Sequence, residues 1–184
     1  MDKKTFKRIF WKQYLLLERD FLETDEFVSI DKANNKTFSN RYTYILLNVC
    51  SEMDSVSEEF CKQIEKTDKI KQNTIVKKID KIIETVPLIR NCKVKTKFPY
   101  AEMYFVPFQK FDDNSSAEWW KAYNKVKHSR ADIPEKGIPN YQLANLKNVM
   151  SAMSALYILC TIFFFSLEGE WCDLEESRLF EKLP

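Results

Sequence analysis

Glycine and histidine are scarce in this chain, and their scarcity excludes several classes of protein. The 184 residues include two glycines, Gly137 and Gly169, and one histidine, His128. Phosphate-binding loops and dinucleotide-binding turns need several glycines at fixed spacing, so the sequence holds neither. The turns of many-stranded barrels and sandwiches also rely on glycine. The sequence therefore predicts a mostly helical, all-α fold in a single domain over residues 1–184.

The chain also lacks the patterns of a zinc site or a disulfide framework. Its five cysteines are an odd number, none lies in a Cys-x-x-Cys pair, and there is a single histidine to complement them. We therefore expect no metal and no cofactor, and we expect reduced thiols that pack as small apolar side chains. Residues 1–5 lack the apolar stretch of a signal peptide. Together these features favour the cytoplasm.

One apolar run is long enough to cross a bilayer. Residues 149–167 contain no charged side chain over nineteen positions. Hydroxyl residues interrupt the run, however, and it continues an amphipathic stripe of apolar positions at steps of three and four that begins at Leu143. We interpret the run as the central core helix of a bundle without membrane contact. A membrane span is the alternative.

Hydrophobic periodicity predicts helices separated by polar loops. A loop is expected over residues 31–40, and an extended or irregular insertion, such as a short hairpin, over residues 88–111. An acidic tail occupies residues 168–184. The helices are expected at Lys3–Glu23, Arg41–Lys66, Thr74–Thr85, Ala117–Arg130 and Tyr141–Leu167.

Charge is uneven along the chain although the net formal charge is only +2. Residues 62–98 carry eleven basic and four acidic side chains, a net of +7, whereas the tail carries a net of −4. A stretch of this charge can attract phosphate groups. The alternative is that its lysines coat a solvated helix face.

Reactive side chains gather in one segment, residues 119–130. On a helix, Asn124 and His128 lie one turn apart with Lys127 beside them, and Arg130 follows at the end of the helix. An imidazole can move a proton near neutral pH, and cations can offset charge that develops on a phosphate. The set predicts binding or processing of a phosphodiester. The alternative is a histidine without a catalytic role.

The segment W-W-x-x-Y-N-x-x-K-H-x-R, with the helix that follows it, resembles the C-terminal half of a HEPN-type domain. The resemblance covers roughly residues 117–165, and the first hundred residues only as a set of preceding helices. It implies an all-helical bundle of the kind common in prokaryotic toxin–antitoxin and phage-defence systems. Active members are metal-independent ribonucleases with an Arg-Asn-x-x-x-His motif, two copies of which meet across a dimer. Asn124 and His128 match that motif, whereas Tyr123 stands at the arginine position.

The resemblance also implies roles for these side chains. His128 would act as the general acid or base and Asn124 would position it, while Lys127 and Arg130 would stabilise charge in place of the missing arginine. One histidine per chain means that a two-histidine mechanism requires a homodimer. The expected substrate is RNA, and an antitoxin or effector protein is a candidate partner. The alternative is a non-catalytic binding or assembly module for RNA, a nucleotide or a partner protein.

Two further pairs of residues are candidates at this site. Trp120 and Tyr123 are candidate substrate contacts. The helical spacing of Tyr123 with Trp119 and Val126 also fits a side chain that packs into the core. Glu52 and Asp54 are acidic positions on an otherwise largely apolar helix. They are expected either to face the site or to be half-exposed polar positions.

Overall fold

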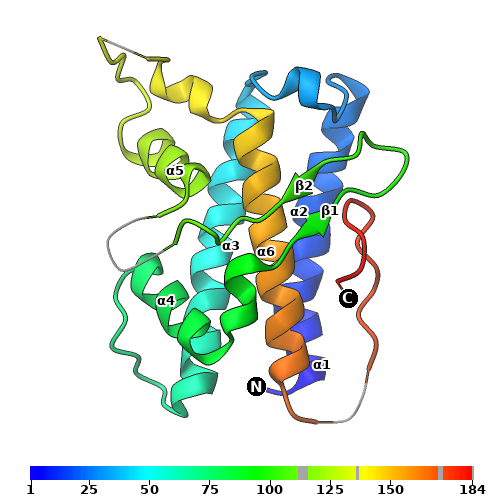
Figure 1. The fold of residues 1–184 in the computed structure, drawn as a ribbon, viewed down its shortest axis with the longest axis vertical. Coiled ribbons are helices and arrows are strands. Elements are labelled where there is room, and N and C mark those ends of the chain that lie inside the picture. The colour runs from blue at the N-terminus through cyan, green and yellow to red at the C-terminus, as the bar shows by residue number, and fades with distance from the viewer. Residues whose placement is uncertain (112–115, 136, 170–171, 184) are drawn as a thin grey trace.

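Three long helices lie side by side and form the body of the fold (Figure 1). They are α2 (Lys12–Leu22), α3 (Asn40–Glu65) and α6 (Leu146–Ser166). The computed structural model describes residues 1–111, 116–135, 137–169 and 172–183. Within these residues the chain is mostly helical, so the prediction of an all-α fold is confirmed.

The N-terminal helix predicted over residues 3–23 is present, with a change of pitch inside it. It comprises α1 (Lys3–Phe6), a π-helical turn η1 (Lys7–Trp11) and α2, and it continues into the 3-10 turn η2 (Glu23–Glu26). The Asp2 carboxylate accepts the Thr5 N–H at 2.7 Å and caps the first turn. The wider π turn allows two successive residues, Phe10 and Trp11, to enter the core.

The next two helices begin and end close to the predicted positions. The loop of residues 31–40 contains a short 3-10 turn, η3 (Lys32–Asn34). The Ser39 hydroxyl then accepts the Tyr42 N–H at 3.0 Å and caps α3, which ends at Glu65 and is followed by Lys66 at a left-handed φ of 50°. The helix α4 (Ile75–Thr85) is capped by Thr74 and packs against α3.

The region predicted to be extended contains a minimal hairpin. After the 3-10 turn η4 (Pro87–Asn91), β1 (Val94–Lys95) pairs antiparallel with β2 (Tyr104–Phe105). The strands cross one face of the bundle, in front of α6 (Figure 1). This confirms the short insertion between the helices.

The last long helix begins later than predicted. A helix was expected from Tyr141, but residues Asn140–Leu143 form a separate 3-10 turn, η5, and α6 begins at Leu146. The break occurs because the Asn145 side chain accepts the Asn148 N–H at 3.1 Å, which makes Asn145 the N-cap. The prediction of one continuous helix from Tyr141 is therefore wrong at its start.

Helix α6 is the core helix of the bundle. Among the described residues it is the one helix long and apolar enough to cross a membrane, yet 78% of its most apolar window is buried inside the protein. Its Phe163 ring stacks on Phe60 of α3 at 4.5 Å between centroids and meets Phe6 of α1 edge-on at 5.2 Å. An apolar helix that is mostly buried is typical of the core of a helical bundle.

The C-terminal segment returns along the bundle and is anchored by one buried carboxylate. Glu18 of α2 is 1% exposed. It accepts hydrogen bonds from the Tyr14 hydroxyl at 2.7 Å and from the Ser177 hydroxyl. It also accepts the backbone N–H groups of Arg178 at 2.9 Å and Leu179 at 3.2 Å. The tail predicted only as acidic is therefore a packed part of the fold.

Candidate functional site

The predicted site lies on α5 (Glu118–His128), a helix at the side of the bundle (Figure 1). Its sequence complements the helix dipole, with Glu118 in the first turn and basic side chains, including Lys127 and His128, in the last turn. The helix ends two residues before the predicted Arg130. Beyond it, the Asn140 amide donates to the Ser129 carbonyl at 2.9 Å and ties the following loop to the end of α5.

One face of α5 is packed into the core. Trp119 donates its indole N–H to the Pro107 carbonyl at 3.0 Å, and its ring meets Trp120 edge-on at 5.8 Å. The Trp120 and Tyr123 rings lie 4.8 Å apart, and their exposed fractions are 7% and 6%. The two candidate substrate contacts therefore sit inside the protein, and they present little surface to a substrate.

The other face of α5 carries the predicted catalytic residues. Lys127, His128 and Arg130 are exposed, and Asn124 is half-buried. The Lys127 ammonium lies 5.4 Å from the centroid of the Tyr123 ring. The structure thus brings an amide, an imidazole and two cations to one end of one helix.

Arg130 is directed back towards its own helix. Its Nε donates to the Val126 carbonyl at 3.3 Å, one turn earlier. This bond holds the base of the guanidinium against the end of α5 and satisfies one of the last carbonyls of the helix. The arginine is therefore tied to the last turn of α5.

The two acidic residues singled out on α3 have other neighbours. The Asp54 carboxylate pairs with the Lys78 ammonium of α4 at 2.9 Å. Glu52 is half-buried, and burial raises the pKa of its carboxyl group above the ordinary value. Burial, together with the nearby Glu52 charge, raises the pKa of the Cys160 thiol on α6. Asp54 thus pairs with α4, the Glu52 charge lies near Cys160 of α6, and both acidic residues are half-exposed.

Part of the charge of the basic stretch of residues 62–98 is neutralised in the folded chain. Lys62 pairs with Glu59 at 2.7 Å, and Lys97 pairs with Glu176 at 2.9 Å. Two further lysines of the stretch pair in the same way with acidic residues outside it, namely Lys78 with Asp54 and Glu58, and Lys95 with Glu102 and Glu181. The net charge of +7 in the sequence therefore does not form a +7 surface.

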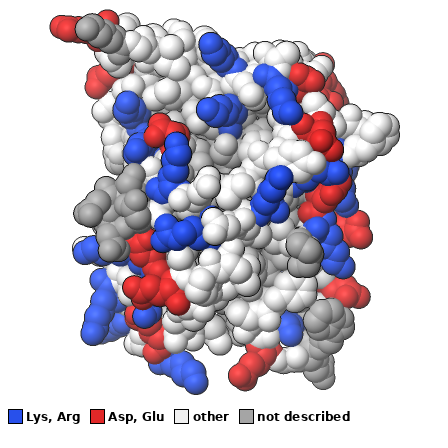
Figure 2. Space-filling view, in the orientation of Figure 1, with Lys and Arg blue, Asp and Glu red and all other residues white. Residues whose placement is uncertain are grey.

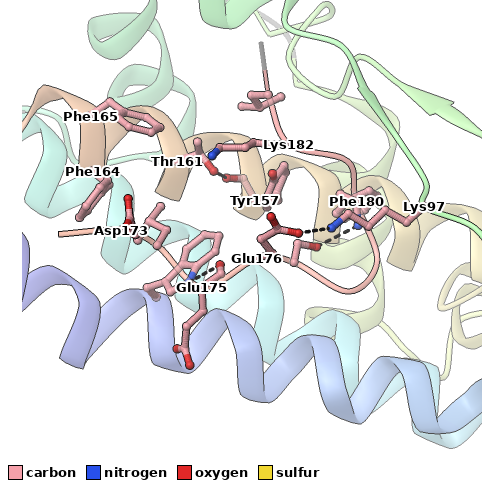
Figure 3. A pocket seen from close by; sticks show the side chains of 14 residues that line it. Lys97, Tyr157, Thr161, Phe164, Phe165, Asp173, Glu175, Glu176, Phe180 and Lys182 are labelled. Atoms are coloured by element: carbon pink, nitrogen blue, oxygen red, sulfur yellow. Dashed lines mark hydrogen bonds and ion pairs between the residues drawn. The ribbon is translucent and has the colours of Figure 1, made fainter.

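A cavity of about 440 Å³ lies under the C-terminal segment, against α6 and far along the chain from the predicted site. Figure 3 shows aromatic side chains, among them Tyr157 and Phe164, with the Lys97–Glu176 ion pair at the rim. The Trp11 indole N–H donates to the Glu175 carbonyl at 3.1 Å, and the Tyr157 hydroxyl donates to the Glu181 carbonyl at 3.1 Å. Because these bonds join the cavity wall to the C-terminal segment, the cavity is a feature of how that segment packs.

Metal chemistry has no ready donor set in the part of the chain that the structure describes. No three His, Cys, Asp or Glu side chains gather there as a metal site would need. All five cysteines are free thiols, and three of them, Cys50, Cys61 and Cys160, are buried.

Comparison of the chain with protein-family models, curated proteins and solved structures finds no match.

Proposed function

We propose that this chain is a HEPN-like RNA-binding protein of a prokaryotic defence or toxin–antitoxin system, and that RNA binds at the C-terminal end of α5. The observation that carries the proposal is the division of α5. Its aromatic face is buried, whereas Lys127, His128 and Arg130 all face solvent at one end. Exposed cations beside an imidazole suit the phosphates and bases of RNA.

In this proposal, the chain forms a homodimer in the cytoplasm. Each chain supplies one histidine. Two-fold pairing of the α5 ends would double the basic surface and place two imidazoles near one RNA strand. An antitoxin or a larger effector protein would act by covering the same ends.

Binding is tested with a fluorescently labelled single-stranded RNA and the double variant Lys127→Gln/Arg130→Gln. The matched control is Arg8→Gln/Lys12→Gln, which removes the same charge from exposed positions on the N-terminal helix. We expect the α5 variant to weaken binding at least about tenfold at low salt, because it removes two phosphate contacts. Equal affinities for the α5 variant and the control would contradict the proposal.

Metal-independent cleavage of RNA is the second candidate, and the exposure of His128 one turn after Asn124 favours it. In this reaction a base removes the proton of a ribose 2′-hydroxyl, and its oxygen bonds to the adjacent phosphorus. The bond from phosphorus to the 5′-oxygen breaks, and an acid protonates that oxygen, leaving a cyclic phosphate. In a dimer the two His128 side chains would serve as base and acid, with Lys127 and Arg130 offsetting the phosphate charge.

The burial of Tyr123 favours binding without cleavage, because a neutral phenol in the core cannot anchor a phosphate as an arginine would. Incubation of labelled RNA with the wild type and His128→Ala, with and without chelator, separates the two candidates. Cleavage that survives chelator and disappears in His128→Ala supports the ribonuclease. If the wild type does not cleave the RNA, the result supports the non-catalytic binding module.

A further inference from the structure

A second basic surface forms a groove on one face of the bundle. We call it the lysine groove and define it by Lys32, Lys110 and Lys147. It has a volume of about 390 Å³ and lies between η3, the chain after β2, and the starts of α5 and α6. Figure 2 shows basic side chains around an uncharged surface in the middle of this face. From these features we infer that the lysine groove binds the phosphates of a single-stranded RNA that also reaches His128, an inference that rests on the proposed function.

The charge of the lysine groove is not neutralised by the fold. Within the described residues, none of its three lysines forms an ion pair with a carboxylate. The one acidic residue in its wall, Glu118, pairs with Lys121 at 3.4 Å. Within the described residues the groove therefore keeps its positive charge, and a concave surface of one sign concentrates polyanions.

Lys147 stands where a basic residue weakens its own helix. It lies in the first turn of α6, where the helix dipole is positive and acidic side chains are favoured. Its backbone N–H donates to the Asn35 carbonyl at 3.2 Å, and that of Leu146 donates to Thr37 at 2.9 Å. These bonds fix the turn that carries the ammonium at the groove. A side chain that opposes the local electrostatics of its helix points to a role in binding.

An aromatic ring in the wall makes the groove suitable for a nucleobase as well as a phosphate. Tyr104 of β2 is 49% exposed and lines the groove. The Lys93 ammonium lies 4.0 Å from the centroid of its ring and adds a fourth cation to the neighbourhood. Exposed aromatic rings next to cations are typical of surfaces that bind single-stranded nucleic acid, where bases stack and phosphates pair. This combination favours RNA over an acidic protein.

The groove and the α5 motif are a suitable distance apart for one strand. Residues at the start of α5 form part of the groove, and His128 is its last residue. The ten residue steps between Glu118 and His128 span about 15 Å of helix. This corresponds to about four nucleotides at the 3.4 Å rise per nucleotide of a strand with stacked bases. A single short RNA can therefore contact both surfaces at once.

The test compares the full-length wild type with the triple variant Lys32→Gln/Lys110→Gln/Lys147→Gln. The control is Lys69→Gln/Lys71→Gln/Lys77→Gln, an equal loss of charge from exposed lysines in and before α4. Binding of a labelled ten-nucleotide oligouridine is measured by fluorescence anisotropy at several salt concentrations, with uridine monophosphate as a second ligand. Circular dichroism checks that both variants keep their helices.

We expect the groove variant to bind oligouridine at least tenfold more weakly than the control near 100 mM salt. Its slope of log affinity against log salt should fall by about 2, because three lost contacts remove about 0.7 each. The monophosphate should bind far more weakly than the oligomer. If the wild type binds oligouridine but the groove variant and the control bind it equally well, the inference about the groove is overturned and the proposed function stands. A wild type that does not bind RNA overturns the proposed function as well, and equal affinity for the monophosphate makes the groove a nucleotide site instead.

Discussion

At the residue scale, Tyr123 has the clearest consequences for function. Its position corresponds to the arginine of the motif that the chain resembles, but its ring is buried against Trp120 with Lys127 beside it. Its spacing with Trp119 and Val126 indicated an inward position, and all three side chains are indeed buried. The spacing along the sequence was sufficient to predict this burial because residues that share a helix face are close together in the chain.

Replacing Tyr123 with arginine should destabilise the protein. Tyr123→Arg buries a guanidinium without a carboxylate partner, at a cost of about 3 kcal/mol in the free energy of unfolding. For a chain of 184 residues this lowers the melting temperature by about 6–12 °C. Thermal denaturation followed by circular dichroism measures the change. The control is Lys125→Arg on the exposed face, which should melt like the wild type.

The opposite result would also be informative. An unchanged melting temperature in Tyr123→Arg, together with a gain in RNA cleavage, would mean that the new side chain reaches the surface beside His128. In that case the family motif would be restorable, and the packing described for α5 would be incorrect.

At the element scale, the start of α6 shows where periodicity fails. Apolar residues at steps of three and four run through residues 143–150, and they predicted one helix from Tyr141. Leu143 lies in the 3-10 turn η5, yet it packs against the core as a residue of α6 would. The Asn145 cap separates the two elements, together with the backbone bridge between Asn145 and Phe38.

The packing of the C-terminal segment had no local signal. Glu18 is separated from its partners Ser177 and Leu179 by about 160 positions in the chain. The sequence showed only an acidic tail, because the hydrogen bonds that fix it join two distant parts of the chain. Burial and the nearby Glu18 charge also raise the pKa of the Tyr14 hydroxyl well above its ordinary value, so it remains a donor to the carboxylate.

Loss of the Glu18 carboxylate should therefore release the tail. Glu18→Gln keeps the shape of the side chain but turns an amide N–H₂ towards groups that are themselves donors. We expect a loss of about 2 kcal/mol in the free energy of unfolding, or about 4–8 °C in the melting temperature. Trypsin should also cleave faster after Arg178.

The control for this element is Glu26→Gln, which changes an exposed carboxylate just after the same helix. It should alter stability by less than about 0.5 kcal/mol and leave the rate of cleavage unchanged. If Glu18→Gln melts and is cleaved like this control, the buried carboxylate does not hold the C-terminal segment.

At the scale of the whole molecule, the basic stretch found in the sequence and the basic groove assembled by the fold are different surfaces. In the sequence, the basic stretch is residues 62–98. In the folded chain, several lysines of this stretch pair with acidic residues that lie outside it, on α3, before β2 and in the C-terminal segment. The lysine groove, in contrast, is built from residues 32, 110 and 147, which no local window brings together. The fold thus gathers three exposed lysines beside the start of α5.

The most direct measurement of the central claim is a map of where RNA touches the full-length protein. A short RNA containing 4-thiouridine is crosslinked by light, and the modified peptides are identified by mass spectrometry. RNA binding at the end of α5 predicts adducts in residues 124–130, which decrease when unlabelled RNA competes and in the variant Lys127→Gln/Arg130→Gln. Adducts confined to residues 62–98, or no adducts that unlabelled RNA removes, would contradict RNA binding at α5.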